Sequence, residues 1–165
     1  MRDSLHRSLQ SVLKNANVKM EQNTDEKRPV DIAVYWWPNS RSSALIEIKW
    51  LGWSKSESKK KANSYTKYTN SRAQDGADQL AEYLELEKQS TTVHVPKSYH
   101  VVFDARRKNL KDAETPLPKT DALAFRHDEV LYDPDHSKIR EDFAPPVRFF
   151  LEPRENHFAE AKGKN

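Results

Sequence analysis

The sequence predicts an α/β protein with a mixed central sheet and flanking helices, in the order helix, three strands, helix, strand. Three observations carry this prediction. Two segments show apolar residues at helical spacing, several runs are rich in β-branched and aromatic residues, and polar or proline-containing stretches separate them. A chain of 165 residues fits one domain. We expect this domain to span residues 1–151, with a polar tail at 152–165.

The first helix is indicated by one apolar stripe near the amino terminus. Leu5, Leu9, Val12 and Leu13 follow one another at i, i+4, i+7 and i+8, which places them on one helix face. Residues 18–23 are a short strand candidate. The run at 30–37 and the run at 44–51 are stronger ones, and the short polar segment between them favours an antiparallel hairpin.

The second half of the predicted core is a helix followed by a strand. Residues 54–72 are polar and basic and read as a loop or as the lead-in to a helix. The stripe Ala77, Leu80, Ala81 and Leu84 predicts a helix over 73–87. Residues 98–104 form a strand candidate, and 147–151 form another. Residues 105–142 are interrupted by prolines and predict no clear element.

Composition excludes several classes of protein. Without cysteine, the chain has no disulfide, thiolate metal site or cysteine nucleophile. No apolar run has the length of a membrane span, so we expect a cytoplasmic protein without a membrane partner. A net charge of +3 permits nucleic-acid binding without requiring it.

Charged residues interrupt two apolar strand candidates. Glu47 and Lys49 are two positions apart on one strand, so their side chains leave the same face of the sheet. Asp31 lies near the start of the preceding strand. A hairpin turning at about residue 40 would place Asp31 opposite Lys49. Because burying unpaired charge is costly, these residues need partners or a metal.

The chemistry available to such a group is phosphodiester hydrolysis. Two carboxylates, Asp31 and Glu47, and the carbonyl of Ile48 are oxygen ligands of the kind that Mg²⁺ or Mn²⁺ prefers. A neighbouring lysine can orient or deprotonate a water molecule and steady charge on a phosphate. The alternative is a structural salt bridge across an edge hairpin.

The hairpin between the two helices resembles the PD-(D/E)XK nuclease superfamily, because it carries Asp31 followed by Glu47-Ile48-Lys49. The helix after it resembles the RecB-like branch of that superfamily, because Gln79 and Tyr83 match its Gln-x-x-x-Tyr element. One residue is inserted in the Pro-Asp dipeptide here. The resemblance implies a restriction-endonuclease-like core, with Gln79 and Tyr83 bordering the active site. It also implies an upstream acidic residue, for which we favour Glu21. An ordinary helix flank and a surface strand residue are the alternatives for these positions.

A basic and aromatic stretch follows the predicted catalytic strand. Trp53 is the best candidate for stacking on a base, and lysines beside it could grip phosphates; these are Lys55, Lys59, Lys60 and Lys61. A solvated loop is the alternative. A second basic cluster lies at Arg106, Arg107, Lys108 and Lys111.

The sequence thus leads us to expect a metal-dependent endonuclease that acts on DNA in restriction, repair or phage defence. A homodimer or a targeting subunit would supply recognition, because no recognition module is visible. Two alternatives stay open, namely a nucleic-acid-binding module that does not cut and an RNA-directed nuclease.

Overall fold

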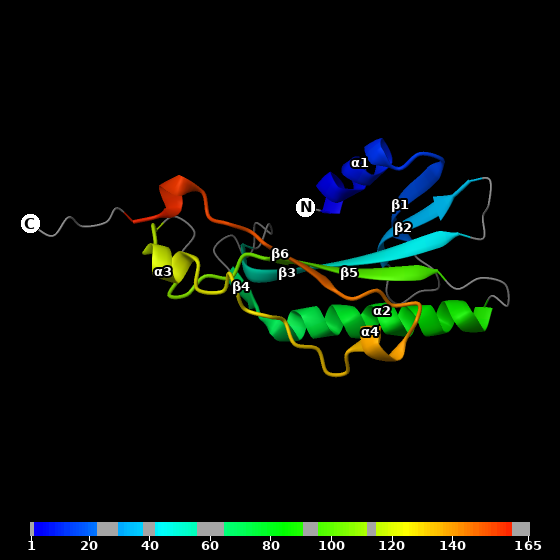
Figure 1. Cartoon of the computed structure of the whole chain (residues 1–165). Coiled ribbons are helices and arrows are strands. Elements are labelled where there is room, and N and C mark those ends of the chain that lie inside the picture. Colours follow the sequence, from blue (N-terminus) through cyan, green and yellow to red (C-terminus); the bar gives the residue numbers. More distant parts are fainter. Residues whose placement is uncertain are drawn as a thin grey trace, which may run out of the picture.

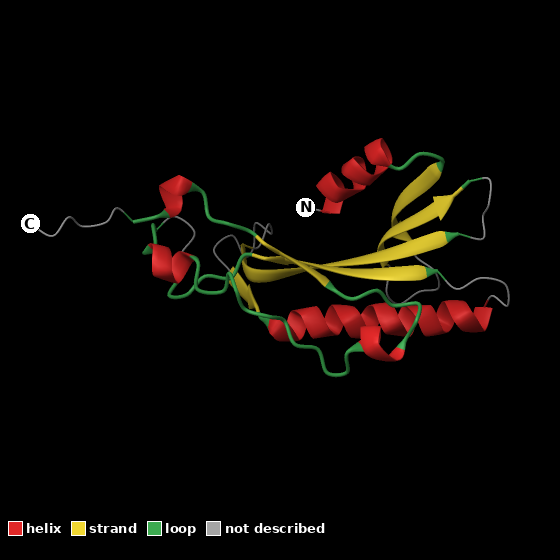
Figure 2. Ribbon diagram, viewed as in Figure 1, coloured by secondary structure: helices red, strands yellow, loops and turns green. Residues whose placement is uncertain are grey.

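The structure, a computed structural model, describes residues 2–22, 30–37, 42–55, 65–90, 96–111 and 115–159. In that part of the chain, five strands form a sheet in the order β1-β2-β3-β5-β6, and a further strand, β4, pairs with β3. Helix α1 lies on one face of the sheet and α2 on the other (Figures 1 and 2). The predicted α/β class and mixed sheet are confirmed, and the predicted order of elements lacks one strand, β4, before α2.

Helix α1 covers the sheet over its first three strands. It spans Arg2–Val12, and the strands beneath it are β1 (Ala16–Gln22), β2 (Val30–Trp36) and β3 (Ser43–Lys55). Three members of the predicted stripe, Leu5, Leu9 and Leu13, pack against a cluster of buried side chains from these strands. The fourth, Val12, is 73% exposed, so its predicted place on the buried face is wrong. No residue of α1 is fully buried. The helix therefore contacts the sheet only through the apolar side of its amphipathic surface.

Helix α2 covers the opposite face and carries the larger core. It spans Asn70–Ser90, three residues longer at each end than predicted. Its predicted apolar stripe meets strands β2 and β3 in one buried cluster that includes Val30, Ala33 and Leu45. The charged residues of β3 are therefore held between the sheet and this helix.

The predicted register of the β2–β3 hairpin is wrong by two residues. Ile32 pairs with Ile46 and Ala33 with Leu45, so continuing the ladder by one step places Asp31 opposite Glu47, not opposite Lys49. A shift of two residues keeps every side chain on its own face, so the apolar pattern fits both registers equally well. Predicted turn residues 38–41 lie outside the described residues.

The expectation of a loop over 54–72 is also corrected. Strand β3 continues to Lys55, and β4 (Tyr65–Tyr68) pairs with it antiparallel, with Trp53 opposite Lys67. Strand β4 is short, polar and mostly exposed, so it has no buried alternation that sequence patterns could detect.

The carboxyl-terminal part adds two parallel strands. The strand candidates at 98–104 and 147–151 are confirmed as β5 (Lys97–Asp104) and β6 (Val147–Phe150). Strand β5 pairs with β3, and β6 pairs with β5. Three short helical segments belong to the connections: α3 (Lys119–Ala122), α4 (His136–Ile139) and η2 (Glu155–His157).

The predicted polar tail makes backbone contacts with the rest of the fold in its described part, which ends at residue 159. Backbone hydrogen bonds join Leu117 to His157 and Ala159, beyond the predicted domain end at 151. Nowhere in the described ranges does a helix combine the length and hydropathy that crossing a bilayer requires.

Candidate active site

The two charged residues of β3 form a buried ion pair. Glu47 is 2% exposed and Lys49 is 7% exposed, because α2 covers the face of β3 from which they project. The Lys49 ammonium donates a hydrogen bond to Oε1 of Glu47. It donates another to Oε1 of Gln79 on α2, over 3.1 Å. The predicted grouping of Glu47, Lys49 and Gln79 is thus present in the structure.

Asp31 joins this group from the neighbouring strand. Its Oδ2 accepts a hydrogen bond from the backbone N–H of Ile48 over 2.9 Å, which brings its carboxylate beside the Glu47–Lys49 segment. Its Oδ1 lies 3.4 Å from the guanidinium of Arg2 on α1. The Asp31 side chain is 21% exposed, so solvent reaches the group at this carboxylate.

Burial dominates the electrostatics of Glu47. Loss of hydration raises the pKa of its carboxyl, the positive charge of Lys49 opposes that rise, and the negative charge of Asp31 adds to it. Its second oxygen, Oε2, is buried and accepts no hydrogen bond. A buried carboxylate oxygen without a partner is costly, and a bound cation would remove that cost.

These donors fit a hard divalent cation. Asp31, Oε2 of Glu47 and the carbonyl of Ile48 supply oxygen atoms from two adjacent strands, as Mg²⁺ or Mn²⁺ prefers. Among the residues that the structure describes, no three His, Asp or Glu side chains gather around one point. Glu21 would be the third acidic residue, and its side chain lies outside the described part although β1 includes its backbone.

The remaining predicted site residues divide into two groups. Tyr83 is 6% exposed and packs in the core cluster between α2 and the sheet. It is therefore neither a solvent-exposed residue on the side of a helix nor in a position to contact a substrate directly. Trp53 lies on the β3–β4 ribbon, with its ring edge-on to Tyr65 at 6.4 Å. The side chains of Lys55, Lys59, Lys60 and Lys61 fall outside the described residues.

Sequence reasoning missed His100, which the structure places beside the ion pair. His100 is fully buried and pairs with Glu47 across the parallel β5–β3 ladder. Burial lowers the pKa of His100 to about 4, and the positive charge of Lys49 contributes less to the same shift. The sequence of β5 could have indicated this residue, because strand alternation places the polar residues Ser98, His100 and Asp104 on the buried face.

Helix α2 can approach this group closely because position 76 is glycine. A Cβ atom there would lie 2.5 Å from Cγ of Lys49, 2.6 Å from its Cε and 2.7 Å from Cε1 of His100. Gly76 thus leaves the space in which the Lys49 chain and the His100 ring lie side by side.

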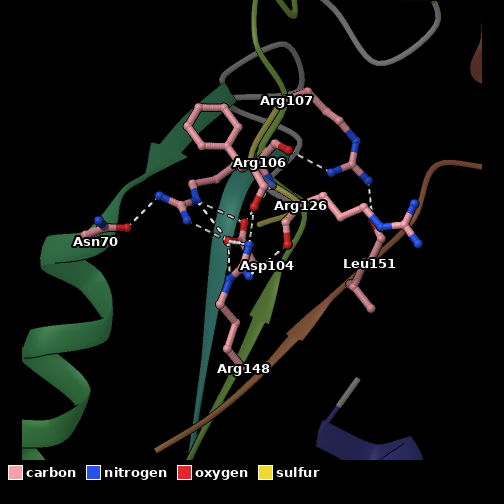
Figure 3. Close-up of polar contacts among 8 residues, drawn as sticks. Asn70, Asp104, Arg106, Arg107, Arg126, Arg148 and Leu151 are labelled. Atoms are coloured by element: carbon pink, nitrogen blue, oxygen red, sulfur yellow. Dashed lines mark hydrogen bonds and ion pairs between the residues drawn. The ribbon is translucent and has the colours of Figure 1, made fainter. Parts of the chain in front are cut away.

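A second charged cluster lies where β5 ends, two residues beyond the level of Lys49. The buried carboxylate of Asp104 accepts hydrogen bonds from Arg106 on both oxygens and from Arg148 over 2.8 Å (Figure 3). Arg106 also reaches Asn70 at the start of α2 and lies over the ring of Phe125. Burial would raise the pKa of Asp104, but these hydrogen bonds outweigh it, so its pKa lies below the usual range.

This cluster fastens the ends of β5, β6 and α2 to one another. Arg106 is 8% exposed and its guanidinium is occupied by Asp104 and Asn70, so it is a structural residue and not a free phosphate contact. The predicted basic cluster that begins at Arg106 is therefore only partly available to a ligand.

One cavity in the described part of the chain lies away from the ion pair. A cavity of about 760 Å³ is bordered by Trp36, Pro96 and Tyr99, at the opposite end of β3 and β5 from Lys49. Two titratable residues close together in the sequence, Asp135 and His136, have structural contacts. Asp135 caps α4 through the N–H of Ser137, and His136 contacts Asp78.

Comparisons with family models, with curated proteins and with solved structures find no match for this chain.

Proposed function

We propose that the chain is a metal-dependent nuclease of the PD-(D/E)XK type, with a restriction-endonuclease-like core and DNA as its substrate. The observation that carries the proposal is the convergence of four residues that the sequence pattern singles out. Asp31 bonds the segment between Glu47 and Lys49, and Lys49 bonds both Glu47 and Gln79. These residues come from β2, β3 and α2, so their meeting depends on the tertiary fold.

Each residue has a distinct task in this proposal. Asp31 and Glu47 would hold Mg²⁺ or Mn²⁺ together with the Ile48 carbonyl. The bound cation supplies Lewis-acid polarisation of the scissile phosphate and an acidified water molecule. Lys49 orients the attacking water through its ammonium and stabilises charge on the phosphate. Gln79 fixes the direction of the Lys49 chain through the hydrogen bond described above.

The β3–β4 ribbon is the part of the described surface best suited to contact the nucleic acid. Trp53, Tyr65 and Lys67 lie on one face of the ribbon, because Trp53 pairs with Lys67 and contacts Tyr65. Aromatic rings that alternate with a cation suit unstacked bases and a phosphate backbone. We therefore infer that substrate reaches Asp31 with a single-stranded portion held on this ribbon.

One observation favours the second candidate, a nucleic-acid-binding module that does not cut. Glu47 and Lys49 are buried and pair with each other, as a structural salt bridge would. In a nuclease, a cation would be held by Asp31 and by Oε2 of Glu47, the carboxylate oxygen that Lys49 leaves without a partner. In a binding module the pair stays closed and Asp31 gains no ligand.

The deciding experiment uses Asp31→Asn, because this substitution removes the exposed charge and keeps an oxygen for the Ile48 N–H. Plasmid DNA, single-stranded DNA and RNA are each incubated with the protein and Mg²⁺, Mn²⁺ or EDTA. Lys138→Ala is the matched control, since that side chain is 80% exposed and far along the chain from the group.

The nuclease proposal expects metal-dependent cutting that Asp31→Asn and Lys49→Met abolish and Lys138→Ala preserves. Cutting of RNA alone would make the enzyme RNA-directed. Binding of nucleic acid without any cutting, for all three substrates and both metals, would favour the binding module.

A further inference from the structure

His100 is a polar side chain in the interior of the protein. It is fully buried, and neither Nδ1 nor Nε2 makes a hydrogen bond. An unpaired polar group inside a protein destabilises the fold. A phenylalanine or leucine would fill the same space without that cost, so the ring nitrogens call for an explanation in terms of function.

The ring lies within the proposed active site. Glu47 is its cross-strand neighbour, and the edge of Tyr132 closes the other side, with ring centroids 5.9 Å apart. Carbonyl groups of Glu47 and Ala73 lie close to the ring. A neutral imidazole has one nitrogen with a lone pair, and that nitrogen can accept a hydrogen bond.

Lys49 is the donor that this lone pair can serve. Its Cε and the Cε1 of His100 both lie within 2.7 Å of the point where Gly76 lacks a Cβ, so the two side chains are immediate neighbours. An ammonium group has three N–H donors. Glu47 and Gln79 occupy two of them.

Cation binding changes this arrangement. A cation held by Oε2 of Glu47 would draw electron density from that carboxylate and weaken its hydrogen bond to Lys49, so the ammonium would gain from another acceptor in this buried site. We propose that His100 is that acceptor: a positioning residue that takes a hydrogen bond from Lys49 when Glu47 holds the metal. This inference rests on the proposed nuclease function, and it adds a residue that the family pattern does not supply.

The test has one readout that does not depend on cutting. Protein labelled with ¹⁵N in histidine contains six imidazole rings, and the signals lost in His100→Phe identify its two ring nitrogens. Mg²⁺ is then added to the wild type, to Lys49→Met and to the surface control Lys138→Met. We expect one His100 nitrogen to move to the position of a hydrogen-bond acceptor in the wild type and the control, and to stay unchanged in Lys49→Met.

Kinetics supply the second readout. His100→Gln keeps an acceptor and His100→Phe keeps the shape, so a purely structural role predicts that Phe is the milder change. The proposal predicts the reverse, with kcat lowered about 100-fold in His100→Phe, nearly restored in His100→Gln, and KM unchanged in both.

The two ideas fail in distinguishable ways. Suppose Mg²⁺ shifts the carboxylate signals of Asp31 and Glu47 and the protein cuts, but the His100 nitrogens do not move. The role of His100 is then overturned and the nuclease stands. If Mg²⁺ moves none of these signals and nothing is cut, the proposed function falls and the role of His100 falls with it.

Discussion

Replacing Gly76 by alanine tests the packing on which the site depends. In an exposed helix, glycine to alanine stabilises by about 1 kcal/mol, because alanine is the better helix former. Here the added methyl group would meet Lys49 at two atoms and His100 at one, all between 2.5 and 2.7 Å. Real Cβ atoms do not make such contacts, so α2 or both side chains must move.

The expected result is destabilisation. Overpacking of this kind costs about 1–3 kcal/mol, and a buried ring and a hydrogen-bonded lysine leave little room to relax. The net change should be a loss of about 1–2 kcal/mol in the free energy of unfolding, measured from urea curves with an unchanged m-value.

A second background identifies the source of the loss. Lys49→Ala removes the two lysine atoms that the methyl group meets, whereas Lys49→Met keeps carbon or sulfur atoms along the same path. Gly76→Ala should therefore cost clearly less in the Lys49→Ala background than in the Lys49→Met background. The reasoning is refuted if Gly76→Ala stabilises the wild type as an exposed helix position would.

Three further outcomes follow from the described contacts. The pKa of Asp104 is lowered in the folded protein, so its ionised carboxylate stabilises the fold at pH values above its unfolded pKa of about 3.9. This stabilisation is lost as the pH falls from there through the folded pKa, and Asp104→Asn should therefore flatten the acid side of a plot of urea midpoint against pH. His100 binds protons more readily when unfolded, so stability should fall by on the order of 3 kcal/mol between pH 6.5 and about 4, and His100→Phe should remove that slope. On the β3–β4 ribbon, Lys67→Ala should reduce the slope of log binding constant against log salt concentration for single-stranded DNA by about 0.7. Thr66→Ala on the other face is the control, and quenching of Trp53 fluorescence is the signal. An unchanged slope would remove the ribbon from the binding surface.

Local pattern was sufficient for the elements that bury a regular apolar face. The stripe of Leu5, Leu9 and Leu13 and that of Ala77, Leu80 and Leu84 lie where helical spacing placed them. The pairing of Glu47 and Lys49 on one strand face followed from strand alternation alone. Such features depend on residues close in sequence, so a single sequence contains them.

The missed features depend on contacts between distant segments. The hairpin register shifted by two because the apolar faces of β2 and β3 are the same in both registers. His100 has no ligand spacing of its own, and its meaning comes from the parallel pairing of β5 with β3 and from the approach of α2 at Gly76. The family resemblance implied that Tyr83 borders the active site, yet its side chain packs in the core cluster between α2 and the sheet.

The burial of the Glu47–Lys49 pair bears directly on what the site is for. An isolated buried ion pair adds little stability, since the loss of hydration offsets its attraction, and an apolar pair of the same volume is often as good. Stability alone therefore gives a weak reason for these two residues, and a weaker one for the unpaired nitrogens of His100 and the unpaired Oε2 of Glu47. Three uncompensated polar atoms beside one ion pair make a site that a cation at Asp31 would relieve, because it gives Oε2 a ligand and frees Lys49 to meet His100. The same set of atoms is difficult to explain in a module whose only task is to bind phosphate, because the buried carboxylate would repel its ligand.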